Sequence, residues 1–169
     1  RIITNLGVFL YLVLPISLML WLRTVPGTGP WLLYFLLAAS RLGDVGAYLM
    51  GRMIGRHKLI PHLSAGKTIE GSAFGILFSG FGGGLIFYWA WDYSPELQQV
   101  FVHWWMGGVA GMFLGIAGQA GDLVASGLKR MANVKDSGSL LPGFGGMIDM
   151  TDNFMLTTPM LILILMLWP

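Results

Sequence analysis

The chain alternates between long apolar stretches and short segments that contain glycine, proline and charged residues. A helix needs about 20 mostly apolar residues to cross a bilayer core of about 30 Å, and five stretches approach or exceed that length. We predict helices over residues 6–22, 31–52, 72–91, 102–129 and 147–168. The pattern therefore predicts an all-α, polytopic membrane protein with a single transmembrane domain over residues 1–169.

Two of the predicted helices are rich in glycine, and small residues allow neighbouring membrane helices to approach closely. The helix over residues 72–91 contains Gly75, Gly80, Gly82, Gly83 and Gly84. The helix over residues 102–129 contains Gly107, Gly108, Gly111, Gly115 and Gly118. The sequence leaves open whether the first set of glycines faces the second helix or another copy of the chain.

Composition supports the membrane assignment. Apolar residues make up 55% of the chain and charged residues 11%, whereas soluble domains carry about 25% charged residues. The net charge of +2 is too small to indicate nucleic acid as a partner, and the lack of cysteine excludes disulfides and thiolate chemistry. The chain starts with Arg1 and not Met, so we expect it to be the C-terminal part of a longer protein.

The charged loops divide unevenly between the two sides of the predicted bundle. Five helices of alternating direction place eight of the ten basic residues on one side: Arg1, Arg52, Arg56, Lys58, Lys67, Lys129, Arg130 and Lys135. The other side carries Arg23, Asp92 and Glu96. Because basic loops are retained in the cytoplasm, we predict that the basic side is cytoplasmic and that the C-terminus lies outside.

Two polar clusters are expected on this basic side. The first contains Asp44, Ser64, Lys67, Thr68 and Glu70, and the second contains Asp122, Ser126, Lys129, Arg130, Lys135, Asp136, Asp149 and Asp152. Asp122 and Ser126 are four residues apart, and Asp149 and Asp152 are three apart, so each pair shares a helix face. Carboxylates are costly near hydrocarbon and indicate function. For Arg52, Arg56 and Lys58 a role as topology signals is favoured, and we interpret His57, His62 and His103 as loop or interface residues.

The clusters combine carboxylates with basic groups, which is the chemistry of a divalent metal that holds phosphates. Mg²⁺ takes one or two carboxylates plus phosphate oxygens, and basic side chains balance the remaining negative charge. Gly145 and Gly146 precede a predicted helix, where free backbone N–H groups suit a phosphate.

The order of these residues resembles the signature of the phosphatidate cytidylyltransferases (CDP-diacylglycerol synthases). The matching positions are Ser126, Leu128, Lys129, Arg130, Lys135, Asp136, Ser137, Gly138, Leu141, Pro142, Gly145, Gly146, Asp149 and Asp152. Upstream segments also look like that family: Asp44, Ala47, Tyr48 and Gly51, then Ser64, Lys67, Thr68, Glu70 and Gly71, and the pair Gly121-Asp122. The resemblance covers about residues 40–155.

The resemblance implies that CMP passes from CTP to the phosphate of phosphatidate, giving CDP-diacylglycerol and pyrophosphate. It implies Mg²⁺ as the cofactor and leaves a second cation open. It implies an integral protein of the inner or plasma membrane with a cytoplasmic site and with membrane lipids as partners. The resemblance is also compatible with a homodimer. It suggests Asp122 and Asp149 as metal ligands, Asp136 and Asp152 as second-rank ligands, and Asp122, Asp149, Lys129 and Asp136 as the catalytic set. The implied substrate-binding residues are Ser64, Lys67, Thr68, Glu70, Ser126, Arg130, Lys135, Gly145 and Gly146.

The sequence departs from the family pattern at three places. Phe144 stands where the family usually has His, Met150 where it usually has Arg, and Ala65-Gly66 where it usually has Pro-Lys. These changes keep two alternatives open: a different lipid-phosphate acceptor, or a weak or inactive paralogue that binds lipid or nucleotide. A transporter is a further alternative, although the polar groups gather at one face and do not line a path across the bilayer.

Overall fold

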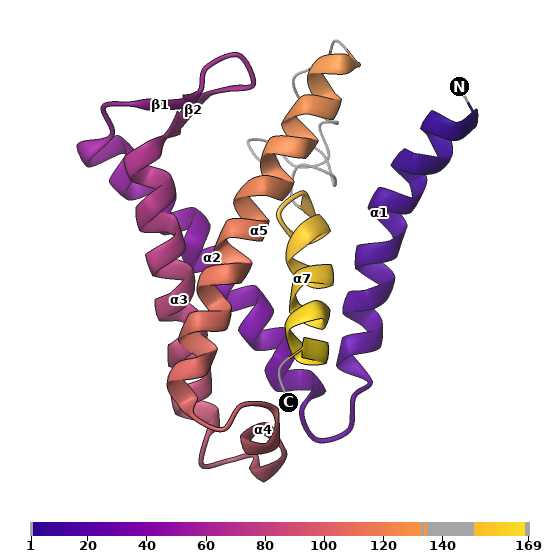
Figure 1. Cartoon of the computed structure of the whole chain (residues 1–169), viewed down its shortest axis with the longest axis vertical. Coiled ribbons are helices and arrows are strands. Elements are labelled where there is room, and N and C mark those ends of the chain that lie inside the picture. The colour runs from indigo at the N-terminus through magenta and orange to yellow at the C-terminus, as the bar shows by residue number, and fades with distance from the viewer. Residues whose placement is uncertain (1, 133, 135–150, 168–169) are drawn as a thin grey trace, which may run out of the picture.

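The computed structural model describes residues 2–132, 134 and 151–167 of the chain, and this part is almost entirely helical. The longer helices are α1 (Ile2–Arg23), α2 (Gly29–Ile54), α3 (Ile69–Ala90), α5 (Trp104–Met131) and α7 (Phe154–Leu167), and α4 (Pro95–Val100) is short (Figure 1). The predicted all-α class is therefore confirmed. Arg1 lies outside the described residues.

Three of the described helices are long and apolar enough to cross a membrane: α2, α3 and α5. The apolar part of α1, Phe9–Arg23, and helix α7 are shorter. The structure therefore supports an integral membrane protein, and the predicted number of five spanning helices stays a prediction.

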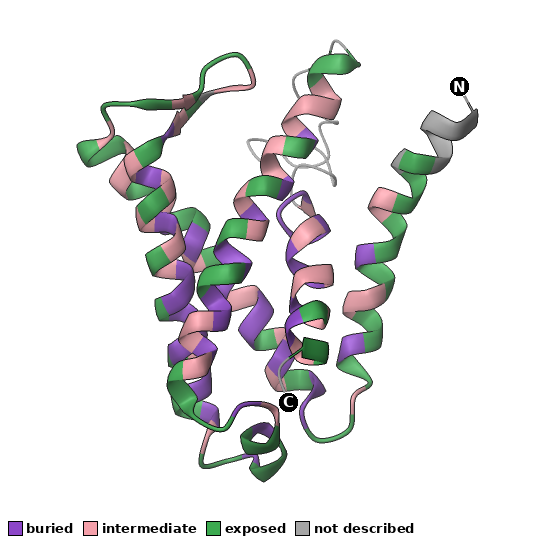
Figure 2. Ribbon diagram, in the orientation of Figure 1, coloured by how far each residue is buried: buried purple, intermediate pink, exposed green. Residues whose placement is uncertain are grey.

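Helices α2, α3 and α5 form the centre of the bundle because glycines bring their backbones together. A Cβ atom at Gly83 of α3 would lie 2.5 Å from the Gly107 carbonyl oxygen of α5, and one at Gly82 would lie 3.0 Å from the Ala38 carbonyl oxygen of α2. The glycine face of α3 is buried along these contacts (Figure 2). The α3 glycines therefore face α2 and α5, which answers the question that the sequence left open.

A short antiparallel hairpin joins α2 to α3, where the sequence indicated only a basic loop. Strand β1 is Lys58–Ile60 and strand β2 is Ser64–Thr68. The hairpin is fixed at its base because the Glu70 carboxylate accepts the backbone N–H groups of Arg56 and His57 at 3.1 and 3.2 Å. The short helix α4 follows the turn after α3, and Pro95 at its first position suits a helix start.

The last described helix differs from the uninterrupted helix predicted over residues 147–168. Asp152 and Asn153 form a turn, and α7 begins only at Phe154. The Asp152 carboxylate accepts the backbone N–H of Asn153 at 2.8 Å. Local side-chain to backbone bonds of this kind compete with the hydrogen bonds of a helix and favour a turn.

The hairpin, the start of α1 and the end of α5 lie at one end of the molecule, and α4 lies at the other end (Figure 1). The described basic residues of the predicted cytoplasmic side belong to the hairpin, its flanks and the end of α5: Arg52, Arg56, Lys58, Lys67, Lys129 and Arg130. The fold thus brings segments that are far apart in sequence to one polar end.

Candidate functional site

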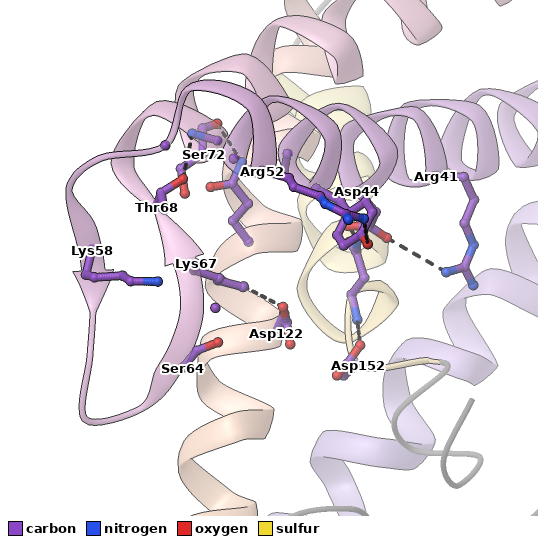
Figure 3. Close-up of a pocket in the computed structure, with 18 residues that line it drawn as sticks. Arg41, Asp44, Arg52, Lys58, Ser64, Lys67, Thr68, Ser72, Asp122 and Asp152 are labelled. Carbon is purple, nitrogen blue, oxygen red and sulfur yellow. Dashed lines mark hydrogen bonds and ion pairs between the residues drawn. The ribbon is translucent and has the colours of Figure 1, made fainter. Parts of the chain in front are cut away.

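A cavity of about 650 Å³ opens at this polar end. Its wall combines helix α2, the hairpin, helix α5 and the turn before α7 (Figure 3). The charged side chains that line it are Arg41, Asp44, Arg52, Lys58, Lys67, Asp122 and Asp152. Four cations and three carboxylates thus share one wall, and members of both predicted clusters meet there, among them Lys67 of the first and Asp122 of the second.

Lys67 and Asp122 link the hairpin to the bundle. The Lys67 ammonium of β2 forms an ion pair with the Asp122 carboxylate of α5, and Figure 3 shows the two side chains pointing toward each other across the cavity. Both side chains are partly exposed, at 22% and 35%. A phosphate that enters the cavity can therefore reach the ammonium, and a cation can reach the carboxylate.

Asp152 supplies a second carboxylate from the turn before α7. Its side chain is only 12% exposed, and the Lys129 ammonium lies 3.8 Å from its Oδ2 atom. Burial and then the charge of Asp122 raise the pKa of Asp152 to about 7. The buried environment disfavours the charged form of this carboxyl group, and the like charge of Asp122 adds to the effect.

Asp44 forms the third acidic position, on helix α2. The Asn153 Nδ2 atom donates to the Asp44 Oδ1 atom at 2.7 Å, and the Arg41 guanidinium lies 3.8 Å from Oδ2. The same guanidinium lies 5.0 Å from the centre of the Phe154 ring, within the range of a cation–π contact. Arg41 and Asp44 are three residues apart on α2, a spacing at which two side chains share a helix face, and Arg41 also lines the cavity.

Thr68 and Glu70 serve mainly to hold the hairpin on α3. Thr68 is the N-cap of α3, and its Oγ1 atom accepts the Gly71 N–H at 3.1 Å. The Glu70 carboxylate lies 2.6 Å from His57 Nδ1. Thr68 and Ser64 still line the cavity, whereas Glu70 is not among its lining residues.

The remaining predicted residues fall into two groups. Ser126 and Arg130 lie on α5 beyond Asp122 and do not line the cavity, while Lys129 reaches Asp152. The other predicted site residues lie outside the described part of the chain: Lys135, Asp136, Gly145, Gly146 and Asp149. Two positions that depart from the family pattern, Phe144 and Met150, also lie outside it.

Sequence reasoning missed several residues of the cavity wall. Asn153 and Gln119 are the clearest cases: Asn153 bonds Asp44, and the Gln119 Nε2 atom donates to the Ser72 carbonyl at 2.9 Å. Asn153 directly follows Asp152, the last position of the motif, and an amide beside a carboxylate is a weak signal that could have drawn attention to it. Gln119, a polar residue within a run of small ones, gave a similar signal.

The described carboxylates suit a divalent cation. Among the described residues no group of three or more ligating side chains is close enough to hold a metal ion alone. Mg²⁺ usually takes only one or two carboxylates and completes its shell with phosphate oxygens and water. Asp122 and Asp152 line the same cavity, and a cation bound there would offset the charge of both carboxylates.

Comparison with known proteins agrees with this chemistry. A family model described as "Cytidylyltransferase family" matches residues 1–168. The chain is similar to proteins named phosphatidate cytidylyltransferase from Staphylococcus epidermidis (43% identical over 128 residues), Staphylococcus saprophyticus (41% over 128) and Staphylococcus aureus (45% over 124). Each alignment covers 73% of this chain and 45% of the relative, so the chain spans less than half the length of these relatives.

Proposed function

The chain belongs to the cytidylyltransferase family, and from this premise we propose that it transfers CMP from CTP to the phosphate of phosphatidate. The products are CDP-diacylglycerol and pyrophosphate. The observation that carries the proposal is the cavity in which Lys67 of the hairpin meets Asp122 of α5. One polar cavity at the end of a membrane bundle offers groups for phosphates and for a cation, and the activity named for the relatives supplies the reaction.

The proposed reaction needs no nucleophile from the protein. A phosphate oxygen of phosphatidate attacks the α-phosphorus of CTP, and the bond from that phosphorus to the bridging oxygen of pyrophosphate breaks. The protein has to align two polyanions and offset their charge, which is how enzymes accelerate phosphoryl transfer. The basic side chains on the cavity wall can provide this charge, and they are Arg41, Arg52, Lys58 and Lys67.

The proposed cofactor is Mg²⁺. Asp122 and Asp152 are the described residues that would hold it, together with Asp149 and Asp136 of the signature, which lie outside the described residues. When bound, the ion would neutralise phosphate charge and orient the triphosphate. A second cation and a homodimer remain predictions.

We also propose that the cavity faces the cytoplasm of an inner or plasma membrane. Support comes from the basic residues around the cavity end and from the acidic Asp92 and Glu96 near the other end, since basic loops are retained on the cytoplasmic side.

The direct test is an assay of the protein in lipid nanodiscs with CTP and phosphatidate. We expect CDP-diacylglycerol and pyrophosphate in equal amounts with Mg²⁺, and neither product after chelation by EDTA. A panel of other lipid phosphates tests the acceptor. Absence of CDP-lipid with phosphatidate, or equal yields with and without EDTA, would contradict the proposal.

A further inference from the structure

Asn153 connects two of the three acidic positions of the cavity. The residue is 6% exposed and lies in the turn between Asp152 and α7. Its side-chain Nδ2 donates to Asp44 Oδ1 at 2.7 Å, and its backbone N–H donates to Asp152 Oδ1 at 2.8 Å. One residue therefore sets the orientation of a carboxylate on α2 and of a carboxylate on the turn.

Helix capping does not account for the Asn153 side chain. Asn153 stands directly before α7, where an asparagine oxygen normally accepts an N–H from the first helical turn. Here the buried Oδ1 atom has no hydrogen-bond partner among the described residues, and the amide nitrogen is directed to Asp44. The side chain thus serves the carboxylate of another helix and not the start of its own.

Gly118 of α5 provides the space that this arrangement needs. A Cβ atom at position 118 would lie 2.1 Å from Asn153 Oδ1 and 3.1 Å from the Thr157 methyl carbon. Real Cβ atoms do not approach that closely, so any side chain at position 118 would push the amide away from its present position. Gly118 does not line the cavity, yet it controls a residue that does.

We propose that Asn153 is a positioning residue for the transfer reaction, which holds the Asp44 and Asp152 carboxylates toward the cavity, and that Gly118 is the position that makes its placement possible. This inference rests on the proposed function. It gives the side-chain amide of Asn153, and Gly118 on α5, a role in orienting the carboxylates that line the cavity.

The test uses Asn153→Ser, Gly118→Ala and the double variant, all in nanodiscs. Serine is a favourable helix N-cap but is too short to reach Asp44. This variant therefore removes the side-chain bond to Asp44 and keeps both the backbone bond to Asp152 and the helix start. Gly84→Ala is the matched control, because a Cβ there would meet its nearest atom at 3.6 Å, an ordinary contact. The readouts are Mn²⁺ binding by electron paramagnetic resonance without nucleotide, and kcat and KM for CTP.

Each single variant should lower kcat by about 10- to 100-fold, the effect of losing a hydrogen bond to a charged group. Mn²⁺ binding should weaken in the same variants, because the Asp44 carboxylate, which lines the same cavity as Asp122 and Asp152, is no longer held by the amide. KM for CTP should change little, and Gly84→Ala should behave like wild type. The double variant should lie close to Asn153→Ser, because the clash of the methyl group at position 118 with the amide oxygen disappears with the amide and only the milder 3.1 Å contact with Thr157 remains.

Three results would overturn the inference. The first is wild-type kcat and Mn²⁺ binding in Asn153→Ser, and the second is wild-type kcat and Mn²⁺ binding in Gly118→Ala. The third is a double variant in which the effects of the two single substitutions add in full. If the wild type makes no CDP-lipid, the proposed function fails, and Mn²⁺ binding still decides the role of Asn153.

Discussion

At the scale of single residues, two ion pairs at the cavity differ in the exposure of their side chains. Lys67 and Asp122 are paired, yet both remain partly exposed, so each can exchange its partner for a ligand group. Asp152 and Lys129 are more buried, with side chains 12% and 17% exposed, and they form the inner end of the same polar system. The more exposed pair is therefore the better candidate for contact with substrate phosphates, and the carboxylates of both pairs remain the candidates for the cation.

We predict that Asp122→Asn lowers the rate of CDP-diacylglycerol formation by about 100-fold or more. The substitution keeps the shape of the side chain but removes the charge that faces Lys67, and a single lost electrostatic group of an active site has effects of this size. The measurement is kcat in nanodiscs at saturating CTP and Mg²⁺.

Asp92→Asn is the matched control for this substitution, because Asp92 is exposed in the turn that follows α3. It should keep wild-type kcat. Robust turnover by Asp122→Asn would remove Asp122 from the proposed cation site.

At the scale of elements, the hairpin closes one wall of the cavity and the glycine contacts fix the helices behind it. The hairpin carries Lys58, Ser64 and Lys67 into the wall, and the Glu70 carboxylate holds its base through the bonds to Arg56 and His57. The placement of these three side chains therefore depends on a residue that does not line the cavity.

We predict that Glu70→Gln raises KM for CTP by about 3- to 10-fold and changes kcat much less. The amide keeps one acceptor oxygen but loses the charge that holds two backbone N–H groups and His57, so the hairpin should open more often. Steady-state kinetics gives both constants, and limited proteolysis within residues 58–64 reports the opening.

Glu96→Gln is the control for Glu70→Gln, because Glu96, in the first turn of α4, also accepts a local hydrogen bond, from Ser94 at 3.1 Å. Its KM and its proteolysis rate should stay at wild-type values. An unchanged KM in Glu70→Gln would mean that the hairpin does not contribute to nucleotide binding.

The glycine contacts give a second prediction at this scale. Gly83→Ala should lower the free energy of unfolding by about 1–3 kcal/mol, because its Cβ would lie 2.5 Å from the Gly107 carbonyl oxygen and 2.7 Å from the Phe35 ring. Thermal unfolding in detergent measures the loss. Its sequence neighbour Gly84 has room for a methyl group, so Gly84→Ala should unfold at the wild-type temperature, and equal losses in the two variants would contradict the packing argument.

The sequence allowed some of these elements to be predicted and not others, for physical reasons. Long apolar stretches specify α2, α3 and α5 because the bilayer requires that length. Strands β1 and β2 have three and five residues and no apolar alternation, and bonds made by Glu70 and Thr68 hold the base of the hairpin beside α3. Short local motifs of this kind depend on contacts that sequence periodicity does not carry.

The same distinction applies to the candidate site. Asp122 and Lys67 could be predicted because charged side chains stand out near apolar helices and because their spacing resembles a known signature. Asn153 and Arg41 could not be assigned, since their roles follow from which helices meet: Asn153 reaches α2 across the bundle, and Arg41 reaches the ring of Phe154.

At the scale of the whole molecule, charge is distributed along the bundle axis. The end that contains the hairpin and the end of α5 carries the described basic loop residues and the cavity, whereas the end near α4 carries Arg23, Asp92 and Glu96 (Figure 1). Between them run three helices with lengths suited to a bilayer. This polarity predicts a single orientation in the membrane.

We predict that His62 in the hairpin turn faces the cytoplasm and that Asp92 faces the opposite side. The chain contains no cysteine, so His62→Cys and Asp92→Cys each introduce a single thiol at an exposed position. In intact cells a membrane-impermeant maleimide should label Asp92→Cys and not His62→Cys. In inverted membrane vesicles the pattern should be reversed.

The labelling experiment separates orientation from activity, because neither position lines the cavity. Labelling of both thiols in detergent confirms that each is reactive, and this control makes protection in cells or vesicles meaningful. If His62→Cys is labelled in intact cells, the basic end lies outside and the proposed access of CTP from the cytoplasm fails, even if the purified protein makes CDP-lipid. If both thiols are labelled from the same side, the two ends of the bundle do not lie on opposite faces of the membrane, and the assignment of α3 as a spanning helix is wrong, since this helix alone connects the hairpin to the turn that contains Asp92.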